Sequence, residues 1–337
     1  IAVGYFLSLK LHVHFTTRRA MKKTAWITAA VLTSLGLAIL MGVLLISDFD
    51  VSKLDKTEYE TNTYIVSEDF EKIKINTKET DIVLLASEDN TCKVICVEQK
   101  KLKHSVSVEN GTLQISEMDT RKWYDHITLF AKPVSLKIYL PSDQLESLRI
   151  DSGTGDVSVP AALTFGSVGM KASTGDIVFE SSVDGELKMI TDTGDITLSG
   201  VKAGKIDLSV STGEILMQSV ICRETASVRV ETGDTRITDM TCRNLLTTGS
   251  TGDITLKNTV ASDTFSIARS TGDVILDHCD AGQITIQTTT GDVSGTLLTE
   301  KIFIARSSTG SIHVPDTSAG GKCQITTSTG DINIRLK

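Results

Sequence analysis

A Thr-Gly-Asp tripeptide, or a close variant of it, recurs ten times between residues 154 and 331 and supplies a carboxylate in nearly every repeat. Successive glycines are 19 or 20 residues apart, and Glu214 and Ser311 replace the aspartate in two repeats. The residues predicted to build these corners are Gly155, Asp156, Gly175, Asp176, Gly194, Asp195, Gly213, Gly233, Asp234, Gly252, Asp253, Gly272, Asp273, Gly291, Asp292, Gly310, Gly330 and Asp331. A carboxylate column could bind cations, but calcium takes about 6–8 oxygen ligands and one carboxylate per repeat supplies too few. We therefore predict that each aspartate caps backbone N–H groups of its own corner and that the chain binds no metal.

The cysteines and histidines form no recognisable catalytic or zinc-binding motif. Cys92 and Cys96 are four residues apart on an expected strand, about 13 Å between Cα atoms, which is too far for a disulfide. Cys222 and Cys242 occupy the same position in adjacent repeats, so they are expected to stack, and a disulfide between them stays open. Cys279 and Cys323 are interpreted as small core residues.

An enzyme is not expected. The sequence lacks the Gly-x-Ser-x-Gly and His-Glu-x-x-His motifs, and the uniform repeat length leaves no insertion that could build a cleft. No catalytic residue and no cofactor are predicted. A carbohydrate-active enzyme built on a β-helix is kept as the less favoured alternative.

The residues around each corner have the alternation of β-strands. We number each repeat from its threonine as position 0. Positions 3 and 5 are mostly apolar, as in Ile177 and Phe179, whereas position 4 is mixed, and a second alternating run precedes the next threonine. Each repeat is therefore expected to be a strand, a bend, a second strand and a corner. The corner glycine is expected at positive φ, and the short side chains at positions −1 and 0 are expected to bond the corner backbone.

A single repeat of this kind cannot bury its apolar face, but a stack of repeats can. The sequence therefore predicts an all-β fold, a parallel β-solenoid of about ten 19–20-residue coils over residues 151–337. The last strand, near Ile332, is expected to leave an open edge at which two chains could associate, with Arg335 and Lys337 as charged residues that discourage such pairing.

The first 47 residues have the charge pattern of a membrane anchor. They contain five basic residues and no acidic ones, and residues 24–47 are uncharged. About 20 apolar residues span a bilayer, and the basic flank predicts a cytoplasmic N-terminus. A cleaved signal peptide is the alternative, but its apolar region is shorter and needs a small-x-small cleavage site that is missing here. We expect 24–47 to be an uncleaved single-pass anchor, preceded by a basic segment (1–23) of which residues 1–20 lie upstream of a native start at Met21.

Two segments connect the expected anchor to the solenoid. Residues 48–63 are polar and charged and are expected to be a tether. Residues 64–150 contain short alternating runs, a hairpin signal at Asn110-Gly111, and a degenerate corner at Thr80-Asp81-Ile82 that lacks its glycine. We expect 64–150 to form irregular β coils that cap the N-terminal end of the solenoid.

The anchor, the tether and the ten serial corners together resemble the bacterial putative-adhesin family of β-strand-repeat envelope proteins, which includes LiaG-like proteins. The resemblance covers about residues 64–337. It implies a β-solenoid at the cell surface or envelope, often linked with envelope stress, and it brings no catalytic residues with it.

The charge composition limits the classes of partner that the chain is expected to bind. The chain has 34 basic and 42 acidic residues, and residues 154–337 alone have 15 and 22, a net charge of −7 that disfavours nucleic acid. We expect a structural or interaction role outside the membrane, as an adhesin or an envelope-stress accessory protein. Expected partners are the membrane through 24–47 and an envelope protein or glycan. A glycan- or peptidoglycan-binding surface module is the main alternative.

Overall fold

The computed structural model describes residues 26–42, 44, 45, 57–122, 133–141 and 145–337. The chain forms two compact units, residues 1–57 with 123–132 and residues 58–122 with 133–337. In the first unit, residues 26–42 are helical and expose apolar side chains such as Leu32 and Leu40. No helix within the described residues combines the length and the apolar character that a membrane crossing requires. The expected anchor (24–47), the basic segment (1–23) and most of the tether (48–63) extend outside the described residues and stay predictions.

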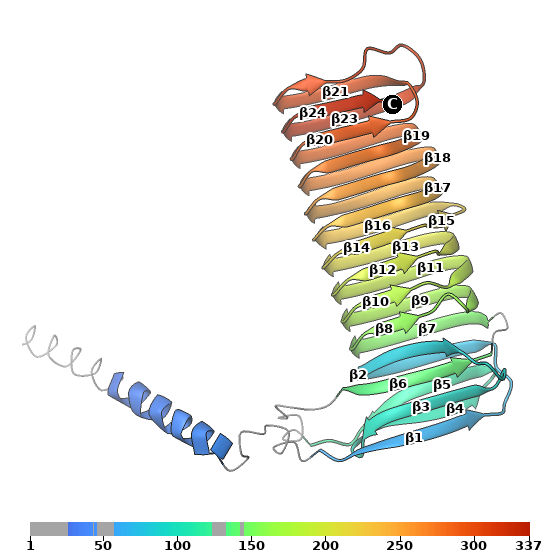
Figure 1. Ribbon diagram of the computed structural model, residues 1–337, viewed down its shortest axis with the longest axis vertical. Coiled ribbons are helices and arrows are strands. Elements are labelled where there is room, and N and C mark those ends of the chain that lie inside the picture. The colour runs from blue at the N-terminus through green and yellow to red at the C-terminus, as the bar shows by residue number, and fades with distance from the viewer. Residues whose placement is uncertain (1–25, 43, 46–56, 123–132, 142–144) are drawn as a thin grey trace, which may run out of the picture. The chain divides into compact units, whose positions relative to one another are not determined.

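The regular elements described in the second unit are all strands (Figure 1). They are β1 (Tyr59–Val66), β2 (Lys72–Ala86), β3 (Cys92–Gln99), β4 (Leu102–Glu109), β5 (Thr112–Asp119), β6 (Val134–Leu140), β7 (Leu145–Thr154), β8 (Val157–Val159), β9 (Thr164–Thr174), β10 (Ile177–Phe179), β11 (Ser182–Thr193), β12 (Ile196–Ser199), β13 (Lys202–Thr212), β14 (Ile215–Gln218), β15 (Ile221–Cys222), β16 (Thr225–Thr232), β17 (Thr235–Thr251), β18 (Ile254–Thr271), β19 (Val274–Thr290), β20 (Val293–Leu297), β21 (Lys301–Thr309), β22 (Ile312–His313), β23 (Gly321–Thr329) and β24 (Ile332–Leu336).

From β7 onward the strands stack as a parallel β-solenoid. Up to β16 a longer strand runs into each corner and a shorter one leaves it, whereas β17, β18 and β19 each run unbroken from one corner to the next. Each strand pairs in parallel with its equivalents in the neighbouring coils, as β10 does with β8 and β12. Position 3 lies over position 3, so Ile177 is in register with Val157 and Ile196. The predicted parallel β-solenoid is confirmed, and its ten corners join about nine turns.

The core is a continuous column inside the coils. Side chains at positions 3 and 5 are buried, for example Ile177 and Phe179, and the alternate residues face solvent. The long strands add a second inward row, and Phe165 on β9 packs against Phe179 with ring centroids 6.5 Å apart. Because every coil buries its apolar side chains against the coils above and below, the core has no single centre.

The corner glycines have the positive φ that the sequence predicts, from 119° at Gly252 to 151° at Gly291. They are also packed tightly against the neighbouring coil. A Cβ atom added to Gly252 would lie 2.1 Å from the carbonyl oxygen of Gly233. The conformation and the lack of space both require glycine at this position.

The aspartates cap backbone N–H groups, but of the adjacent corner and not of their own. The N–H of Asp195 donates to Oδ1 of Asp176 at 2.8 Å, and the N–H of Asp273 donates to Oδ1 of Asp253 at the same distance. The prediction that each aspartate caps its own corner is therefore wrong. The reason is the stacking distance: a short carboxylate that points along the stack reaches the neighbouring N–H. We call this chain of bonds the aspartate ladder.

The aspartate ladder changes at its two variant corners. Ser311 has no carboxylate with which to continue the ladder, and its N–H donates to Asp331 at 2.7 Å. At Glu214 the carboxylate pairs with Arg236, whose guanidinium also binds Asp234 at 2.9 Å. An ion pair thus joins the two corners at this step.

Short hydroxyl side chains also bond the corners, but from position −2. Thr327 donates to the carbonyl of Gly291 at 3.2 Å, and Ser307 donates to that of Gly330 at 2.8 Å. Positions −1 and 0, which were expected to make such bonds, are exposed in most coils. Position −2 is the last inward-facing position before the corner, so its side chain can reach corner carbonyls from the core side.

Residues 58–140 close one end of the solenoid with mostly antiparallel strands, and we call the described part of them the cap. β2 pairs in parallel with β7 and β8 of the first regular coil, and on its other side with β5 and β6. β3 lies antiparallel between β1 and β6. The predicted Asn110-Gly111 hairpin is confirmed as the turn between β4 and β5. The degenerate corner is confirmed too, since the N–H of Asp156 donates to Oδ1 of Asp81 at 3.0 Å.

The last two coils are stacked in the reverse of their sequence order. β23 and β24 pair directly with β19 and β20, and β21 and β22 lie outside them (Figure 1). Ile332 is therefore fully buried whereas Ile312 is 41% exposed. β22 covers only Ile332 and Asn333 of the final strand, so residues 301–313 form most of the outer edge. The expectation that Arg335 and Lys337 discourage pairing at the open edge stays a prediction.

Candidate functional site

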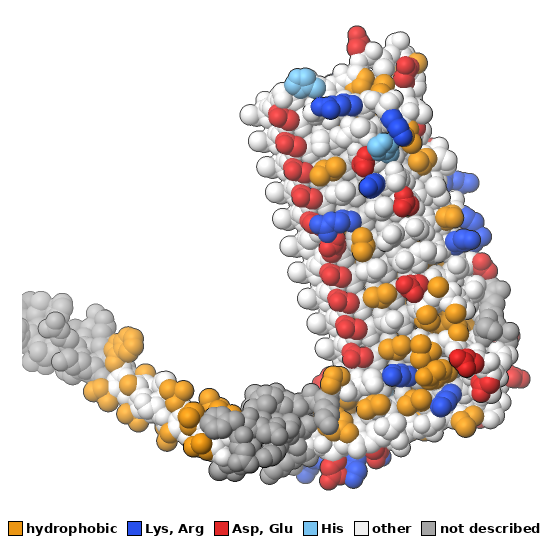
Figure 2. Space-filling model, viewed as in Figure 1, with side chains coloured by type: hydrophobic (Ala, Val, Ile, Leu, Met, Phe, Trp, Pro, Cys, Tyr) orange, Lys and Arg blue, Asp and Glu red, His pale blue; other side chains and the backbone are white. Residues whose placement is uncertain are grey.

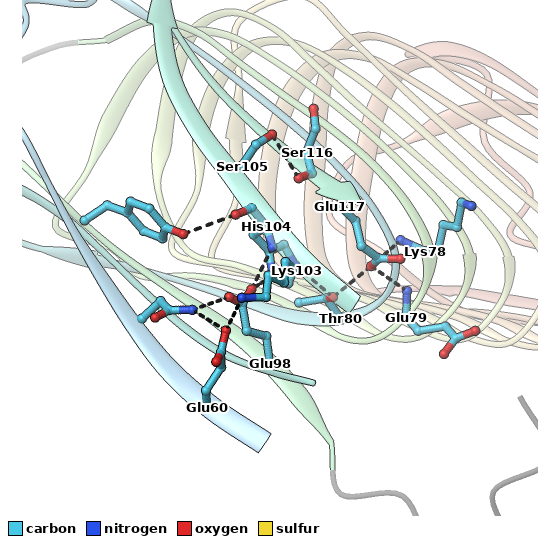
Figure 3. A network of polar contacts seen from close by, with 12 residues as sticks. Glu60, Lys78, Glu79, Thr80, Glu98, Lys103, His104, Ser105, Ser116 and Glu117 are labelled. Atoms are coloured by element: carbon cyan, nitrogen blue, oxygen red, sulfur yellow. Dashed lines mark hydrogen bonds and ion pairs between the residues drawn. The ribbon is translucent and has the colours of Figure 1, made fainter. Parts of the chain in front are cut away.

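The cap contains a buried cluster in which a carboxylate, an imidazole, a thiol and a hydroxyl meet. We call Thr80, Cys96, Glu98 and His104 the cap cluster; they lie on β2, β3 and β4, and Figure 3 shows Thr80, Glu98 and His104. The side chains of Glu98 and His104 are fully buried, as are Thr80 and Cys96. A buried carboxylate must be compensated by hydrogen bonds or by a positive charge, so this cluster is the first place to look for chemistry.

Glu98 is held by donors from two strands. Its Oε1 atom accepts from Asn62 Nδ2 on β1 at 2.7 Å. Its Oε2 atom accepts from the backbone N–H of His104 at 2.6 Å and lies 2.8 Å from His104 Nδ1. These contacts hold the Glu98 carboxylate against the His104 imidazole, between β3 and β4.

The other imidazole nitrogen faces a threonine. His104 Nε2 lies 3.2 Å from Thr80 Oγ1, and the Thr80 hydroxyl donates to Glu117 Oε2 at 3.0 Å. Glu117 Oε2 also accepts the N–H groups of Lys78 and Glu79 at 2.9 and 3.2 Å. Since the single hydroxyl proton of Thr80 goes to Glu117, Thr80 Oγ1 accepts from His104, and the proton on Nε2 is assigned.

The order carboxylate, imidazole, hydroxyl is that of a hydrolase triad, but the arrangement cannot act as one. A triad needs a nucleophile whose proton goes to the imidazole and whose oxygen a substrate can reach. The Thr80 hydroxyl donates to Glu117 instead, and Thr80 is fully buried. The cap cluster is therefore no hydrolytic site.

Cys96 supplies a thiol beside this pair. One ligand atom each from Cys96, Glu98 and His104 lie within 4.8 Å of one another. Burial, and secondarily the Glu98 charge, raises the pKa of Cys96 to about 12, so the thiol stays protonated unless a cation replaces its proton. Thiol, carboxylate and imidazole are the three side-chain types that bind zinc.

Sequence reasoning missed this cluster. Cys96 and Glu98 are two apart and so share a face of β3, and that alternation was available in the sequence. The position of His104 was not, because it depends on the turn that brings β4 back along β3 through the Gln99–Leu102 pair.

The predicted corner residues lie together along one edge of the solenoid, where Figure 2 shows a line of acidic side chains. The structure brings them into a ladder but not into a cluster. Each aspartate of the ladder uses Oδ1 for a neighbouring N–H, as Asp292 does for Asp331 at 2.8 Å. This arrangement stabilises corners, and nothing in it converges several carboxylates on one point.

All six cysteines are buried and unpaired. Cys222 and Cys242 occupy adjacent coils at the same register, next to the Ile221–Thr241 pair, so the predicted stack is confirmed. The disulfide that the sequence left open is not formed. Burial, and secondarily the neighbouring Cys222, raises the pKa of Cys242 to about 12, which makes it a weak nucleophile.

The fold and its surfaces define a class: a β-solenoid with a buried polar cluster in its cap and no catalytic arrangement among the described residues. The chain belongs to the Toastrack DUF4097 family, whose model matches residues 70–241 and 223–337. No curated protein matches the chain significantly. The family match and the structural similarity to putative adhesins agree with the resemblance seen in the sequence. The more specific resemblance to LiaG-like proteins stays a prediction.

Solved structures share the architecture at low identity. A putative adhesin from Parabacteroides merdae is 13% identical, with a TM-score of 0.51, covering 71% of this chain and 97% of that one. A putative adhesin from Bacteroides fragilis is 15% identical, with a TM-score of 0.43 over 83% of this chain and 98% of that one. A putative lipid-binding protein from Parabacteroides distasonis is 19% identical, with a TM-score of 0.47 and coverage of 83% and 98%.

Proposed function

We propose that this chain is a membrane-anchored, extracytoplasmic β-solenoid with a structural or interaction role, acting as an adhesin or as an accessory protein of the cell envelope. Residues 24–47 would hold it in the membrane with its N-terminus in the cytoplasm, and the solenoid would lie outside. The 24-residue uncharged run with a basic flank supports the anchor. The family membership and the adhesin of similar fold support the role.

One observation carries this proposal: the coils stack in register along a single line of corners, with bulges but no long insertion before Leu297. Such a rod has long lateral faces for contact with a partner. Catalytic clefts are usually built by long loops, and the coils before Leu297 carry no long insertion.

The exposed apolar side chains of the regular coils weigh against a glycan partner. In the regular coils the large hydrophobic side chains that are exposed are aliphatic, as are Val178, Leu216 and Ile275 at position 4. Aromatic side chains supply much of the contact energy in binding sites, and sugar rings stack on them. A glycan- or peptidoglycan-binding module therefore remains the second candidate, and a carbohydrate-active enzyme the third.

The test uses the full chain with a C-terminal epitope in bacterial cells. We expect added protease to remove the epitope from intact cells while the protein fractionates with membranes. Free secreted protein cleaved near residue 47 would contradict the anchor, and protection of the epitope in intact cells would contradict the extracytoplasmic location.

A second experiment separates the three candidate roles. The detergent-solubilised full chain is applied to arrays of wall glycans and, separately, incubated with the same polysaccharides to look for cleavage. We expect neither retention nor turnover. Specific retention would move the assignment to the glycan-binding module, and product formation to the enzyme.

A further inference from the structure

We propose that Cys96, Glu98 and His104 form a binding site for a divalent transition-metal ion, with Zn²⁺ the best fit. The three side chains come from β3 and β4 in the cap, and their ligand atoms lie within 4.8 Å of one another. The site is independent of the role proposed for the lateral faces of the solenoid.

The hydrogen bonds around His104 leave its Nδ1 atom facing Glu98. The proton on Nε2 is committed to Thr80, because the Thr80 hydroxyl donates to Glu117. Nδ1 then faces Glu98 Oε2 at 2.8 Å. A lone pair on Nδ1 and a carboxylate oxygen at this distance repel each other. Either a proton shared by Nδ1 and Oε2 or a metal ion therefore lies between them.

The position of Cys96 favours the metal ion over the proton. An imidazolium–carboxylate pair is complete with two partners, and a thiol next to it adds little. A zinc ion needs further ligands, and thiolate, imidazole and carboxylate are its usual ones. Zinc–ligand bonds of about 2.0–2.3 Å place neighbouring ligand atoms about 3.3–3.8 Å apart in a tetrahedron. The three ligand atoms lie within 4.8 Å of one another, so their separations must shorten by up to about 1 Å to reach that spacing.

The net charge of the site is the same with and without the metal ion, which suits a site that excludes water. Without metal, Glu98 and His104 share one proton and the thiol is neutral, so the net charge is zero. When Zn²⁺ binds, the imidazole loses its Nδ1 proton and Cys96 loses its thiol proton, and both protons leave to solvent. The ion with one thiolate and one carboxylate is again neutral, so burial costs little extra in either state.

The surroundings match those of protein zinc sites. A histidine that binds metal through one nitrogen usually donates the other N–H to an oxygen that is itself hydrogen-bonded. Thr80, backed by Glu117, does this for His104. Asn62 donates to the free oxygen of Glu98 at 2.7 Å and orients the carboxylate. These three side chains leave one tetrahedral position that no described side chain fills.

The experiment loads the full chain with Zn²⁺ alone and with Co²⁺ as a spectroscopic probe. Because the site is closed, the protein is unfolded with chelator present and refolded with or without metal. We expect one tightly bound Zn²⁺ per chain, a higher melting temperature with the metal, and a thiolate-to-cobalt charge-transfer band in the near ultraviolet. These wild-type measurements do not depend on whether any variant folds.

Matched variants locate the site. Cys96→Ser should abolish the charge-transfer band and weaken Zn²⁺ binding more than about 100-fold, since loss of an outer-shell partner alone costs 10–100-fold. Cys92→Ser is the control, because Cys92 is a buried cysteine on the same face of β3 outside the cluster, and it should keep both the band and the affinity. Wild type without bound metal or cobalt band, with both ring N–H groups of His104 visible by ¹⁵N NMR, would overturn the proposal in favour of the ion pair. Unchanged binding in Cys96→Ser would overturn it as well.

Discussion

The regular coils and the cap satisfy their polar groups in opposite ways. In the coils, parallel in-register stacking places like residues over one another, so one bond from an aspartate to the next N–H serves corner after corner. In the cap, antiparallel strands bring unlike residues together, and the hydrogen bonds of the Glu98 carboxylate to Asn62 and His104 occur at that one place. The aspartate ladder spreads its contribution to stability over many weak hydrogen bonds, whereas the cap cluster concentrates its contribution in a few side chains. The four predictions below test this contrast.

The largest effect is expected for Glu98→Ala in the cap. Removing the carboxylate leaves a buried histidine and amide without their partner, and loss of one member of a buried charged pair costs about 3–5 kcal/mol. Urea unfolding of the full chain gives the free energy of unfolding. Glu98→Gln, which keeps the volume, should cost less. A loss for Glu98→Ala no larger than that for an aspartate of the ladder would refute the contrast.

Gly252→Val should come next, because it changes one coil. A side chain at φ 119° costs about 1–3 kcal/mol, and its Cβ would also lie 2.1 Å from the Gly233 carbonyl oxygen. The control is Gly200→Val, where φ is 66° and no atom lies within 4 Å of the added Cβ. Thermal melting should show a clearly larger loss at 252. Equal losses would mean that strain alone, and not the stacking contact, determines the cost.

Asp253→Ala should cost about 0.5–2 kcal/mol, as for other side chains that cap backbone N–H groups. It removes only the 2.8 Å bond from the N–H of Asp273. Asp253→Asn keeps an acceptor and relieves repulsion along the ladder, so it should be close to neutral. Melting temperatures are measured with excess calcium and with chelator. A large calcium-dependent rise in wild type that Asp253→Asn abolishes would make the ladder a metal site.

The smallest effect is the acid dependence of single exposed carboxylates. In the cap, hydroxyl donation from Thr91, then Ser87, lowers the pKa of Asp89 from 3.8 to about 2. In the ladder, the backbone N–H of Ser311 lowers the pKa of Asp331. Because the folded pKa is below the unfolded one, each group stabilises the fold above about pH 3.8 and loses that contribution as pH falls through its folded pKa.

The measurement compares Asp89→Asn with wild type in urea at pH 7 and at pH 2. The difference between the two proteins should shrink at the lower pH, because the wild-type carboxylate is then losing its charge. Asp331→Asn should behave in the same direction. A difference of constant size at both pH values would show that the charge of the carboxylate plays no part.

Local periodicity determined most of the solenoid. The 19–20-residue spacing, the alternation at positions 3 and 5 and the invariant glycine predicted the parallel coils, and the structure has them with Gly252 and its equivalents at positive φ. The Asn110-Gly111 turn was predictable for the same reason, since its conformation depends on two adjacent residues. Such features follow from sequence because the forces that set them act between neighbours in the chain or between identical repeats.

Only the tertiary structure decided which coil lies on which, and which unlike side chains meet. The coils that contain Gly310 and Gly330 carry the same pattern, so either could stack on the coil of Gly291, and the structure places Gly330 there. The sequence likewise could not tell which backbone N–H each aspartate caps, because its own corner and the next corner consist of the same residues. The meeting of Cys96, Glu98 and His104 depends on antiparallel pairing in the cap, where no repeat signals the register. A repeating sequence specifies that equivalent residues of the coils stack on one another. The order of the coils, and contacts that occur only once, depend on long-range packing that the period does not encode.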